Sequence, residues 1–314
     1  MKAIQFHAYG NPDVLQHEDI DVPTPRPGQV RIKVAGTSFN GVDGNIRAGF
    51  MQGPMPLTLP HVPGLDVAGI VDELGEGVNG LAVGDEVIGF LPFTQDGAAA
   101  EYVVASADIL APAPKTIPLA DAAALPLVGL TAWQAVFDHA NLTSGQRILI
   151  NGASGAVGGY AVQLAKAAGA HVIATASPRA RHQVTSQGAD VVIDHTAADV
   201  VAAVGEPVDV LLNLAPIEPD TFAALATVVR DGGVVVNTTV WMPAPSDEAR
   251  GVRGVDLYVQ SDREQLSGLV ARVDRRELTV DVARRVSLTE LPAIHSAAAD
   301  GTLRGKIVIV PDAE

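Results

Sequence analysis

The sequence Arg147-Ile-Leu-Ile-Asn-Gly-Ala-Ser-Gly-Ala-Val-Gly-Gly-Tyr-Ala-Val-Gln-Leu-Ala-Lys-Ala-Ala-Gly169 carries the most informative pattern in the chain. It begins with a short apolar run, Arg147–Asn151, which is typical of a buried strand. A glycine turn follows. Val157–Ala168 then places apolar residues at helical spacing until Gly169, a residue type that commonly ends a helix. The pattern predicts a strand, a glycine turn and a helix.

The turn glycines, Gly152, Gly155 and Gly158, follow the spacing G-x-x-G-x-x-G rather than the commoner G-x-G-x-x-G. Such a turn brings a phosphate close to free N–H groups at a helix start, where the helix dipole favours negative charge. A Cβ at Gly155 would keep a pyrophosphate away, and Gly158 lets the helix lie against the strand. The alternative is a tight turn that only joins strand to helix. The residues that follow favour the nucleotide site.

Strands and helices alternate after this turn. The strands expected together with Arg147–Asn151 are His171–Ala176, Val191–Ile193, Val208–Leu214, Gly233–Thr239 and Val255–Val259. The helices expected between them are Arg179–Gln187, Ala197–Val204 and Pro219–Val229. Six strands joined by helical crossovers predict an α/β fold with a doubly wound, six-stranded parallel sheet, which we assign to residues 123–261.

The first hundred residues instead predict a small β-barrel, because short strands alternate with glycine and proline turns. The strands expected there are Ala3–Phe6, Val30–Ala35, Asp66–Leu74, Glu86–Phe90 and Ala100–Val104. Helices are expected at Leu119–Ala124, Gly129–Ala140, Gln260–Arg272 and Leu291–Asp300, and further strands at Leu278–Val286 and Lys306–Val310. The last fifty residues continue past a complete sheet and are expected to return to the first domain, which then comprises 1–122 and 262–314.

Composition narrows the function classes. The 314 residues carry a formal net charge of -15, which argues against nucleic acid or an anionic membrane as a partner. The chain has no cysteine, which excludes disulfides, thiolate nucleophiles and cysteine-ligated zinc, and fits a cytoplasmic protein. We find no signal-peptide pattern and no apolar stretch long enough to span a membrane.

The expected second strand of the sheet predicts the cofactor. It lacks the terminal carboxylate that holds the ribose 2′-OH in NAD sites. Ser177, Arg179 and Arg181 lie where a 2′-phosphate would sit, and an arginine can meet a phosphate with two parallel hydrogen bonds. We therefore predict NADPH rather than NADH; the alternative is that both arginines belong to a solvated helix start. His195 follows the third strand and fits either a contact with the adenine or a solvated loop.

Eight segments together resemble a known family: Met1-Lys-Ala3, Ser38-Phe-Asn-Gly-Val-Asp43, Pro63-Gly-Leu-Asp-Val-Ala-Gly69, Gly80-Leu-Ala-Val-Gly-Asp-Glu-Val-Ile-Gly89, Gly97-Ala-Ala-Ala-Glu-Tyr-Val-Val104, Leu125-Pro-Leu-Val-Gly-Leu-Thr-Ala-Trp133, the glycine turn and Gly305-Lys-Ile-Val308. Over nearly its whole length the chain resembles the zinc-independent medium-chain dehydrogenase/reductases of the quinone oxidoreductase (zeta-crystallin-like) family. The resemblance implies a GroES-like β-barrel catalytic domain, a Rossmann domain and NADPH in the cleft between them. It also implies a homodimer in which Val255–Val259 pairs with its copy.

The resemblance also bears on metal binding. Zinc-dependent relatives place a cysteine near Asn40 and a Gly-His-Glu near Gly64-Leu-Asp66, so the matching residues here are Asn40, Leu65 and Asp66. The segment between Asp85 and Glu101 is too short for the four-cysteine lobe of those relatives. The eight histidines show no paired ligand spacing. We expect no catalytic metal.

Without a metal, hydrogen-bond donors must stabilise the negative charge that develops on the acceptor oxygen. By resemblance, Asn40 is the first candidate donor and Asp43 a residue that orients nearby groups; both equally fit a structural role in a turn. The resemblance assigns the remaining cofactor contacts to Thr131, Ser154, Gly155, Ala156, Val157, Leu214, Asn237, Thr238, Thr239 and Lys306. Thr238 and Thr239 also fit ordinary strand positions, and Lys306 also fits a solvated charge.

Two apolar segments are candidates for the substrate site. Many relatives have a tyrosine in the segment matching Ile46–Pro56, where this chain has Phe50 and Met51. This difference favours an apolar lid, with solvent as one source of the proton. The loop Val240–Gly251 follows the fifth strand, and its Trp241 and Met242 form either a second apolar wall or a packing contact.

These observations lead to one hypothesis and two alternatives. The hypothesis is a zinc-free oxidoreductase that transfers hydride from NADPH to a quinone or an activated alkene. The first alternative is an enoyl or enone reductase for a dedicated biosynthetic intermediate. The second is a non-catalytic NADPH-binding protein, because a fold and a cofactor site do not establish turnover.

Overall fold

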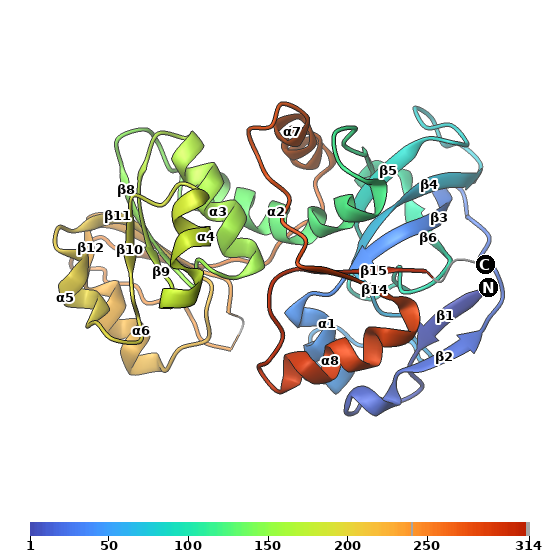
Figure 1. The fold of residues 1–314 in the computed structure, drawn as a ribbon, viewed down its shortest axis with the longest axis horizontal. Helices are drawn as coiled ribbons and strands as arrows, with labels where there is room; N and C mark the ends of the chain where they lie inside the picture. The colour runs from blue at the N-terminus through green and yellow to red at the C-terminus, as the bar shows by residue number, and fades with distance from the viewer. Residues whose placement is uncertain (240, 312–314) are drawn as a thin grey trace. The chain divides into compact units, whose positions relative to one another are not determined.

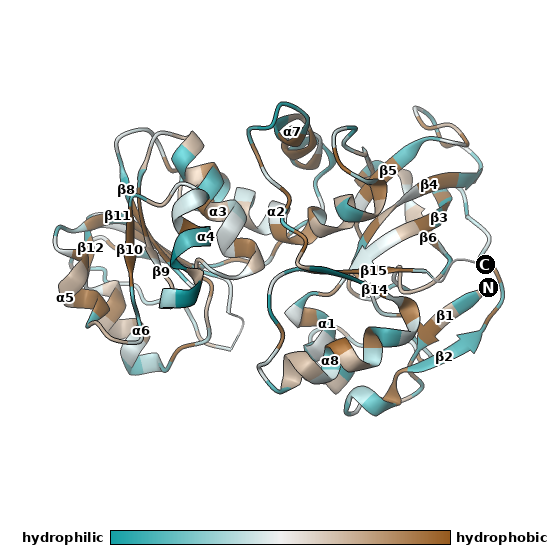
Figure 2. Ribbon diagram, in the orientation of Figure 1, coloured by the Kyte–Doolittle hydropathy of each residue, from teal (hydrophilic) through white to brown (hydrophobic). Residues whose placement is uncertain are grey.

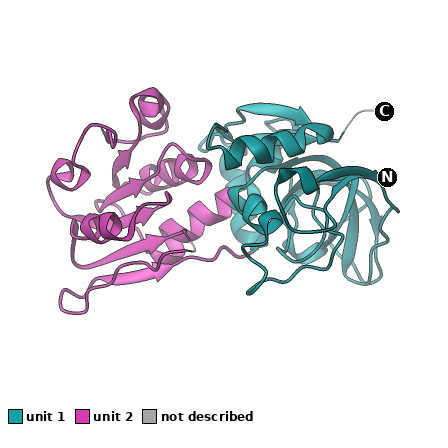
Figure 3. Ribbon diagram, turned by 90° about the horizontal axis from the view of Figure 1, so that it is seen from below, with its two compact units in different colours: residues 1–127, 261–314 teal, residues 128–260 magenta. Residues whose placement is uncertain are grey.

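The strand and helix expected at 147–169 form β8 (Arg147–Asn151) and α3 (Ala156–Ala167). The computed structural model describes residues 1–239 and 241–311 and divides the chain into two units. Unit 1 contains Met1–Leu127 and the residues from Ser261 onward, and unit 2 contains Val128–Gln260 (Figure 3). The boundaries predicted from the sequence, 122/123 and 261/262, are close to these.

Unit 2 is built on a sheet of six parallel strands. With β8, its strands are β9 (His171–Thr175), β10 (Val191–Ile193), β11 (Val208–Asn213), β12 (Val229–Asn237) and β13 (Arg253–Asp256). Its helices after α3 are α4 (Arg181–Ser186), α5 (Val200–Val204) and α6 (Pro219–Ala226). The strand order is β10-β9-β8-β11-β12-β13, so the winding reverses between β8 and β11 (Figure 1). This confirms the predicted doubly wound α/β fold.

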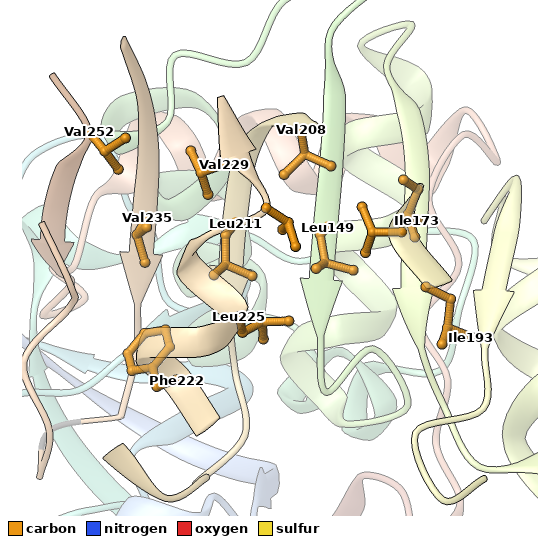
Figure 4. Close-up of a cluster of buried hydrophobic side chains, with 12 residues drawn as sticks. Leu149, Ile173, Ile193, Val208, Leu211, Phe222, Leu225, Val229, Val235 and Val252 are labelled. Carbon is orange, nitrogen blue, oxygen red and sulfur yellow. The ribbon is translucent and has the colours of Figure 1, made fainter. Parts of the chain in front are cut away.

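One face of this sheet packs against α6. Leu149, Leu211 and Val235 come from three adjacent strands and are fully buried, and Phe222 and Leu225 of α6 belong to the same cluster (Figure 4). The strands of a parallel sheet covered by helices are apolar on both faces, and Figure 2 shows hydrophobic colour running through them. The core therefore holds the strand ends in a fixed register.

Unit 1 contains a seven-stranded, mostly antiparallel sheet and a separate pair, β1 (Lys2–Gln5) with β2 (Gln16–Asp19). The sheet strands are β3 (Gln29–Ser38), β4 (Asp66–Leu74), β5 (Glu86–Phe90), β6 (Tyr102–Ser106), β7 (Ala111–Pro112), β14 (Arg284–Ser287) and β15 (Ile307–Val310). The helices are α1 (Gly41–Ala48), α7 (Arg263–Asp274) and α8 (Leu291–Ala299). Because β15 pairs with β3, the C-terminal segment completes the sheet of unit 1.

Several local predictions are corrected. The strand expected over Val255–Val259 is β13, Arg253–Asp256, so Leu257–Val259 lie beyond it. Helix α1 and strand β2 were not expected; α1 has two glycines in eight residues, which weakens its helical pattern. The strand expected over Leu278–Val286 is confined to β14. The helix expected over Gly129–Ala140 begins earlier, as α2 (Pro126–Trp133), and continues as a π-helix over Gln134–His139.

Candidate functional site

The glycine turn between β8 and α3 presents the start of a twelve-residue helix. Ser154 and Gly155 are exposed, and Ala156 and Val157 are partly exposed at the first helical positions. The first N–H groups of a helix have no partner within it, so this end can bind an anion. Gly152 adopts a left-handed conformation with φ 86°, and a Cβ there would lie 3.1 Å from Ala215 Cβ, which places the turn beside the end of β11.

Gly158 permits a close approach, although not the one predicted. A Cβ at Gly158 would lie 2.5 Å from the carbonyl oxygen of Ala153. Ala153 belongs to the turn rather than to β8, so this glycine allows α3 to fold back on the turn. A Cβ at Gly155 would meet only Gly152 O, at 3.4 Å. Beyond its chain neighbours, no other protein atom therefore lies within 4 Å of the position that a Gly155 Cβ would occupy, which leaves room for a ligand there.

The residues after β9 have the character of an anion site. Arg179 and Arg181 are exposed, and Ser177 is partly buried. Neither arginine makes a salt bridge with any residue in 1–239 or 241–311. Arg181 is near enough to Asp194 for its charge to help lower the pKa of that carboxyl. Two exposed guanidinium groups without a salt bridge, beside a helix start whose dipole disfavours them, are available to an anionic ligand. His195 is also exposed, after β10.

Other predicted cofactor residues lie at the strand ends or in α2. Leu214, Thr238 and Thr239 follow β11 and β12, Asn237 ends β12, and Thr131 is buried in α2. The Asn237 amide donates within the protein, to Thr239 O at 2.9 Å and Met242 O at 2.7 Å. The Thr238 hydroxyl donates to Asn213 O, and that of Thr239 to Asn237 Oδ1. These side chains therefore support one another at the carboxyl end of the sheet.

In unit 1 the structure gathers Ser38, Asn40, Asp66 and Lys306 into one buried polar cluster. Asp66 is 0% exposed. Its Oδ2 accepts hydrogen bonds from the Ser38 hydroxyl and from Asn40 Nδ2, the latter at 2.8 Å. Asn40 Nδ2 also donates to Ser38 O at 3.4 Å. The amide predicted to donate to substrate is thus fully engaged inside the protein.

Lys306 supplies the positive charge of this cluster. Its Nζ donates to Asn40 Oδ1 at 2.5 Å and to Phe39 O at 3.2 Å, and lies 3.4 Å from Asp66 Oδ2. Burial lowers the pKa of Lys306, and the charges of Asp66 and Asp43 act in the opposite direction. Lys306 is 5% exposed, so the solvated-charge alternative is wrong. The ammonium is a counterion to a buried carboxylate.

Asp43 lies beside the cluster at the start of α1. Its Oδ2 accepts the Asn40 N–H at 2.8 Å, and its Oδ1 accepts the Gly64 N–H at 3.4 Å. Burial raises the pKa of Asp43 to about 7, against the opposing effect of the Asn40 N–H, and the nearby Asp66 charge raises it further. A buried carboxyl of this kind exchanges a proton near neutral pH.

The four predicted substrate residues lie in different environments. Phe50 is 65% exposed, whereas Met51 is buried, so one side chain of the expected lid packs into unit 1. Trp241 is 62% exposed and Met242 packs partly against the core of unit 2. Val240, the first residue of that expected loop, lies outside the described residues.

Asp66 is the site residue that the sequence did not single out. It was considered only as the counterpart of a zinc ligand, although it starts a strand of apolar residues, Asp66-Val-Ala-Gly-Ile-Val. A carboxylate at the first position of a buried strand needs a partner. That requirement is the signal that would have marked Asp66 as a residue with a buried partner, although it does not identify Lys306.

The chain matches two families and several solved proteins. The alcohol dehydrogenase GroES-like domain matches residues 26–115, and the zinc-binding dehydrogenase family matches 187–309. The chloroplast envelope quinone oxidoreductase homolog of Arabidopsis thaliana is 33% identical, covering 99% of this chain and 98% of that protein. The quinone oxidoreductase from Coxiella burnetii has a TM-score of 0.90 at 32% identity, covering 99% of each chain. A mycobacterial protein complexed with NADPH has a TM-score of 0.85 at 26% identity, covering 99% of this chain and 100% of that one.

The two units and the glycine turn define a member of the medium-chain dehydrogenase/reductase superfamily, whose members use NAD(P)H. Within it, the chain belongs to the quinone oxidoreductase family. Although one matching family is described as zinc-binding, no three His, Asp or Glu side chains within 1–239 and 241–311 are grouped to hold a metal. No helix in the same residues is long and apolar enough to cross a membrane.

Proposed function

We propose that this protein is an NADPH-dependent oxidoreductase that reduces a quinone or an activated alkene without a catalytic metal. The observation that carries the proposal is the pair of exposed arginines, Arg179 and Arg181. They follow β9, the sheet neighbour of β8, whose glycine turn leads into the start of α3. NADPH is supported over NADH because the two guanidinium groups suit a 2′-phosphate. The cytoplasmic location of the protein remains a prediction.

The residues of unit 2 would hold NADPH by complementary charge. The N-terminus of α3 would bind the pyrophosphate, and Ser177 with the two arginines would bind the 2′-phosphate. The bound cofactor supplies a hydride. Reduction then needs a proton, and Asp43, whose pKa is raised to about 7 by burial, is a candidate to hold one. Asn40 remains the candidate donor to the developing oxyanion, and this role would require a change in its present hydrogen bonds.

The first experiment is NADPH oxidation, followed by absorbance, with a naphthoquinone, a cyclic enone and a crotonyl thioester as acceptors. We expect saturable turnover of the quinone or the enone. Turnover of the thioester alone would instead favour an enoyl reductase for a dedicated intermediate. Tight NADPH binding without turnover of any acceptor would favour the non-catalytic alternative and contradict the proposal.

The cofactor preference has a separate test. Replacing both Arg179 and Arg181 by Ala should weaken NADPH binding by about 10- to 100-fold, since hydrogen bonds to charged groups contribute about 1.5–3 kcal/mol. NADH binding should remain unchanged. Arg230→Ala is the matched control, because Arg230 is an exposed arginine of unit 2 that pairs with Asp209. Equal weakening of both cofactors would contradict the 2′-phosphate assignment.

We also propose a homodimer formed through β13. This strand is the last in the order of the sheet, and an edge strand offers unpaired N–H and C=O groups to a copy of itself. Tyr258 follows it and is 62% exposed. Light scattering should give twice the mass of the 314-residue chain, and a monomer at micromolar concentration would contradict the dimer.

A further inference from the structure

Five adjacent strands of unit 2 end in one continuous row of side-chain hydrogen bonds. We name it the carboxyl-end ladder, and its members are Thr175, Asn151, Asn213, Asn237 and Asp256, from β9, β8, β11, β12 and β13. Asn213 is aligned in the sheet with Asn151 and with Asn237. Asn237 is aligned in turn with Asp256. The first four members are at most 8% exposed.

Every bond in the ladder donates in the same direction. The Thr175 hydroxyl donates to Asn151 Oδ1, and Asn151 Nδ2 donates to Asn213 Oδ1, both at 2.8 Å. Asn213 Nδ2 then donates to Asn237 Oδ1 at 3.0 Å. Finally, Asn237 Nδ2 donates to Asp256 Oδ1 at 3.0 Å. Such a chain of aligned bonds is mutually polarising.

One residue determines that direction. Asn237 Oδ1 accepts the Thr239 N–H at 3.2 Å, and a backbone N–H can only donate. Its Nδ2 faces the carbonyl oxygens of Thr239 and Met242, which can only accept. The orientation of Asn237 is therefore fixed, and the orientations of Asn213 and Asn151 follow from it.

The two ends of the ladder hold different parts of the candidate site. At one end, Thr175 Oγ1 accepts the N–H of Gly152 in the glycine turn at 3.0 Å. At the other end, Asp256 Oδ1 accepts the Ala244 N–H at 2.9 Å, while Asn237 holds the carbonyl oxygens of Thr239 and Met242. The backbone around Trp241 is thus fastened at three points.

Packing alone does not account for this row. The residues two positions earlier on β8, β11 and β12 are Leu149, Leu211 and Val235, which fill the core on the same face. Continuing these apolar columns would bury surface without any requirement for partners. Three buried amides instead form directional hydrogen bonds, which fix the positions of the strand ends relative to one another in a way that apolar contacts do not.

We propose that the carboxyl-end ladder is a positioning device, in which Asn237 and Asp256 fix the backbone at Thr239, Met242 and Ala244 relative to the glycine turn. The inference rests on the proposed function in one respect only: that this backbone contributes to the acceptor site. Asp256 belongs to an exposed edge strand and would act on the acceptor through Asn237 and the loop, without touching it.

The test compares two replacements of Asp256. Asp256→Asn keeps an oxygen that can accept from Asn237 Nδ2 and the Ala244 N–H, whereas Asp256→Leu has similar size and no acceptor. Asp231→Leu is the matched control, because Asp231 is an exposed aspartate of the same sheet whose carboxylate pairs with Arg250. All three are made in a Trp133→Phe background, where Trp241 is the only remaining tryptophan.

Two readouts separate this inference from the proposed function. Fluorescence anisotropy of Trp241 needs no activity, and it should fall in Asp256→Leu but remain at the parent value in Asp256→Asn and Asp231→Leu. In Asp256→Leu, Asn237 Nδ2 keeps Thr239 O and Met242 O as acceptors, whereas the Ala244 N–H loses the Asp256 carboxylate. With an accepted substrate, the looser backbone should raise the acceptor KM about tenfold, the scale of one lost hydrogen bond to a charged group, while NADPH binding stays within about twofold. If no acceptor is reduced, the proposed function fails, and the anisotropy still decides the ladder. Unchanged anisotropy in Asp256→Leu, or equal damage by both replacements, would overturn the inference.

Discussion

The two units stabilise buried polar groups in different ways. The cluster of unit 1 buries full charges: Asp66 and Lys306 are both almost inaccessible, and each depends on the other. The ladder of unit 2 buries neutral amides and places its only charge, Asp256, on an exposed residue. A buried charge without its partner is far more costly than a buried amide without one. The same kind of substitution should therefore have different consequences in the two units.

Removing the ammonium of unit 1 should have the largest effect. Lys306→Met leaves Asp66 buried and unpaired, and we expect a loss of about 3–5 kcal/mol in the free energy of unfolding. Denaturant unfolding measures it. Lys33→Met is the control, because Lys33 is an exposed lysine of β3 in the same unit. Adding Asp66→Asn to Lys306→Met should recover part of the loss; no recovery would show that the charge is not the cause.

Asp43, which lies beside this cluster, should make the free energy of unfolding depend on pH. The pKa of Asp43 is raised to about 7 in the folded protein from an ordinary value of 3.8, chiefly by burial. The folded state therefore binds the proton more tightly, and this contribution is complete below about pH 4 and lost as pH rises through about 7. Wild type should lose up to about 1.4 kcal/mol per pH unit relative to Asp43→Asn over that range. The measurement is the free energy of unfolding of both proteins across the range, and parallel curves would contradict the raised pKa.

Breaking the ladder at its centre should cost less than breaking the ion pair. Asn213→Leu leaves Asn151 Nδ2 without its acceptor, while Asn237 Oδ1 loses one donor and keeps the Thr239 N–H and hydroxyl. We expect a loss of about 2 kcal/mol, since an unsatisfied buried group costs about 1–3 kcal/mol. Because no carboxylate is stranded, the loss should be the same at about pH 5 and 7. Denaturant unfolding at both pH values tests this, and a loss as large as that of Lys306→Met would remove the contrast between the units.

Most of unit 2 could be predicted because its elements are locally encoded. Arg147–Asn151 and Val191–Ile193 have the predicted bounds, since a buried parallel strand is a short apolar run bounded by turns. The ladder could not be predicted in the same way. Asn151, Asn213 and Asn237 are far apart in sequence, and only the strand order makes them neighbours.

In unit 1, by contrast, the elements that form the candidate site were only partly predicted. Its long strand Asp66–Leu74 was predicted with the observed bounds, whereas α1, which positions Asp43, was missed. Helix α1 depends on tertiary contacts more than on propensity, because Gly41 and Gly44 weaken it. Lys306 lies 240 residues from Asp66, so no local pattern links the two. The ion pair with the largest expected effect on stability therefore could not be predicted from a local sequence pattern.

His295 is a buried polar side chain that is stabilised neither by an ion pair nor by a hydrogen bond within the described residues. His295 in α8 is 2% exposed, and neither ring nitrogen has a hydrogen-bond partner among residues 1–239 and 241–311. Burial lowers the pKa of His295 to about 3, so its ring is neutral, and it packs edge-on against Phe39 with centroids 4.8 Å apart. His295→Leu removes two unsatisfied nitrogens and loses one aromatic contact, so the free energy of unfolding should change by only about 0 to +1 kcal/mol. Denaturant unfolding of His295→Leu beside His295→Gln separates the causes. Gln again buries an unsatisfied amide and should be less stable than Leu, whereas equal stabilities would mean that the orphaned nitrogens carry no cost.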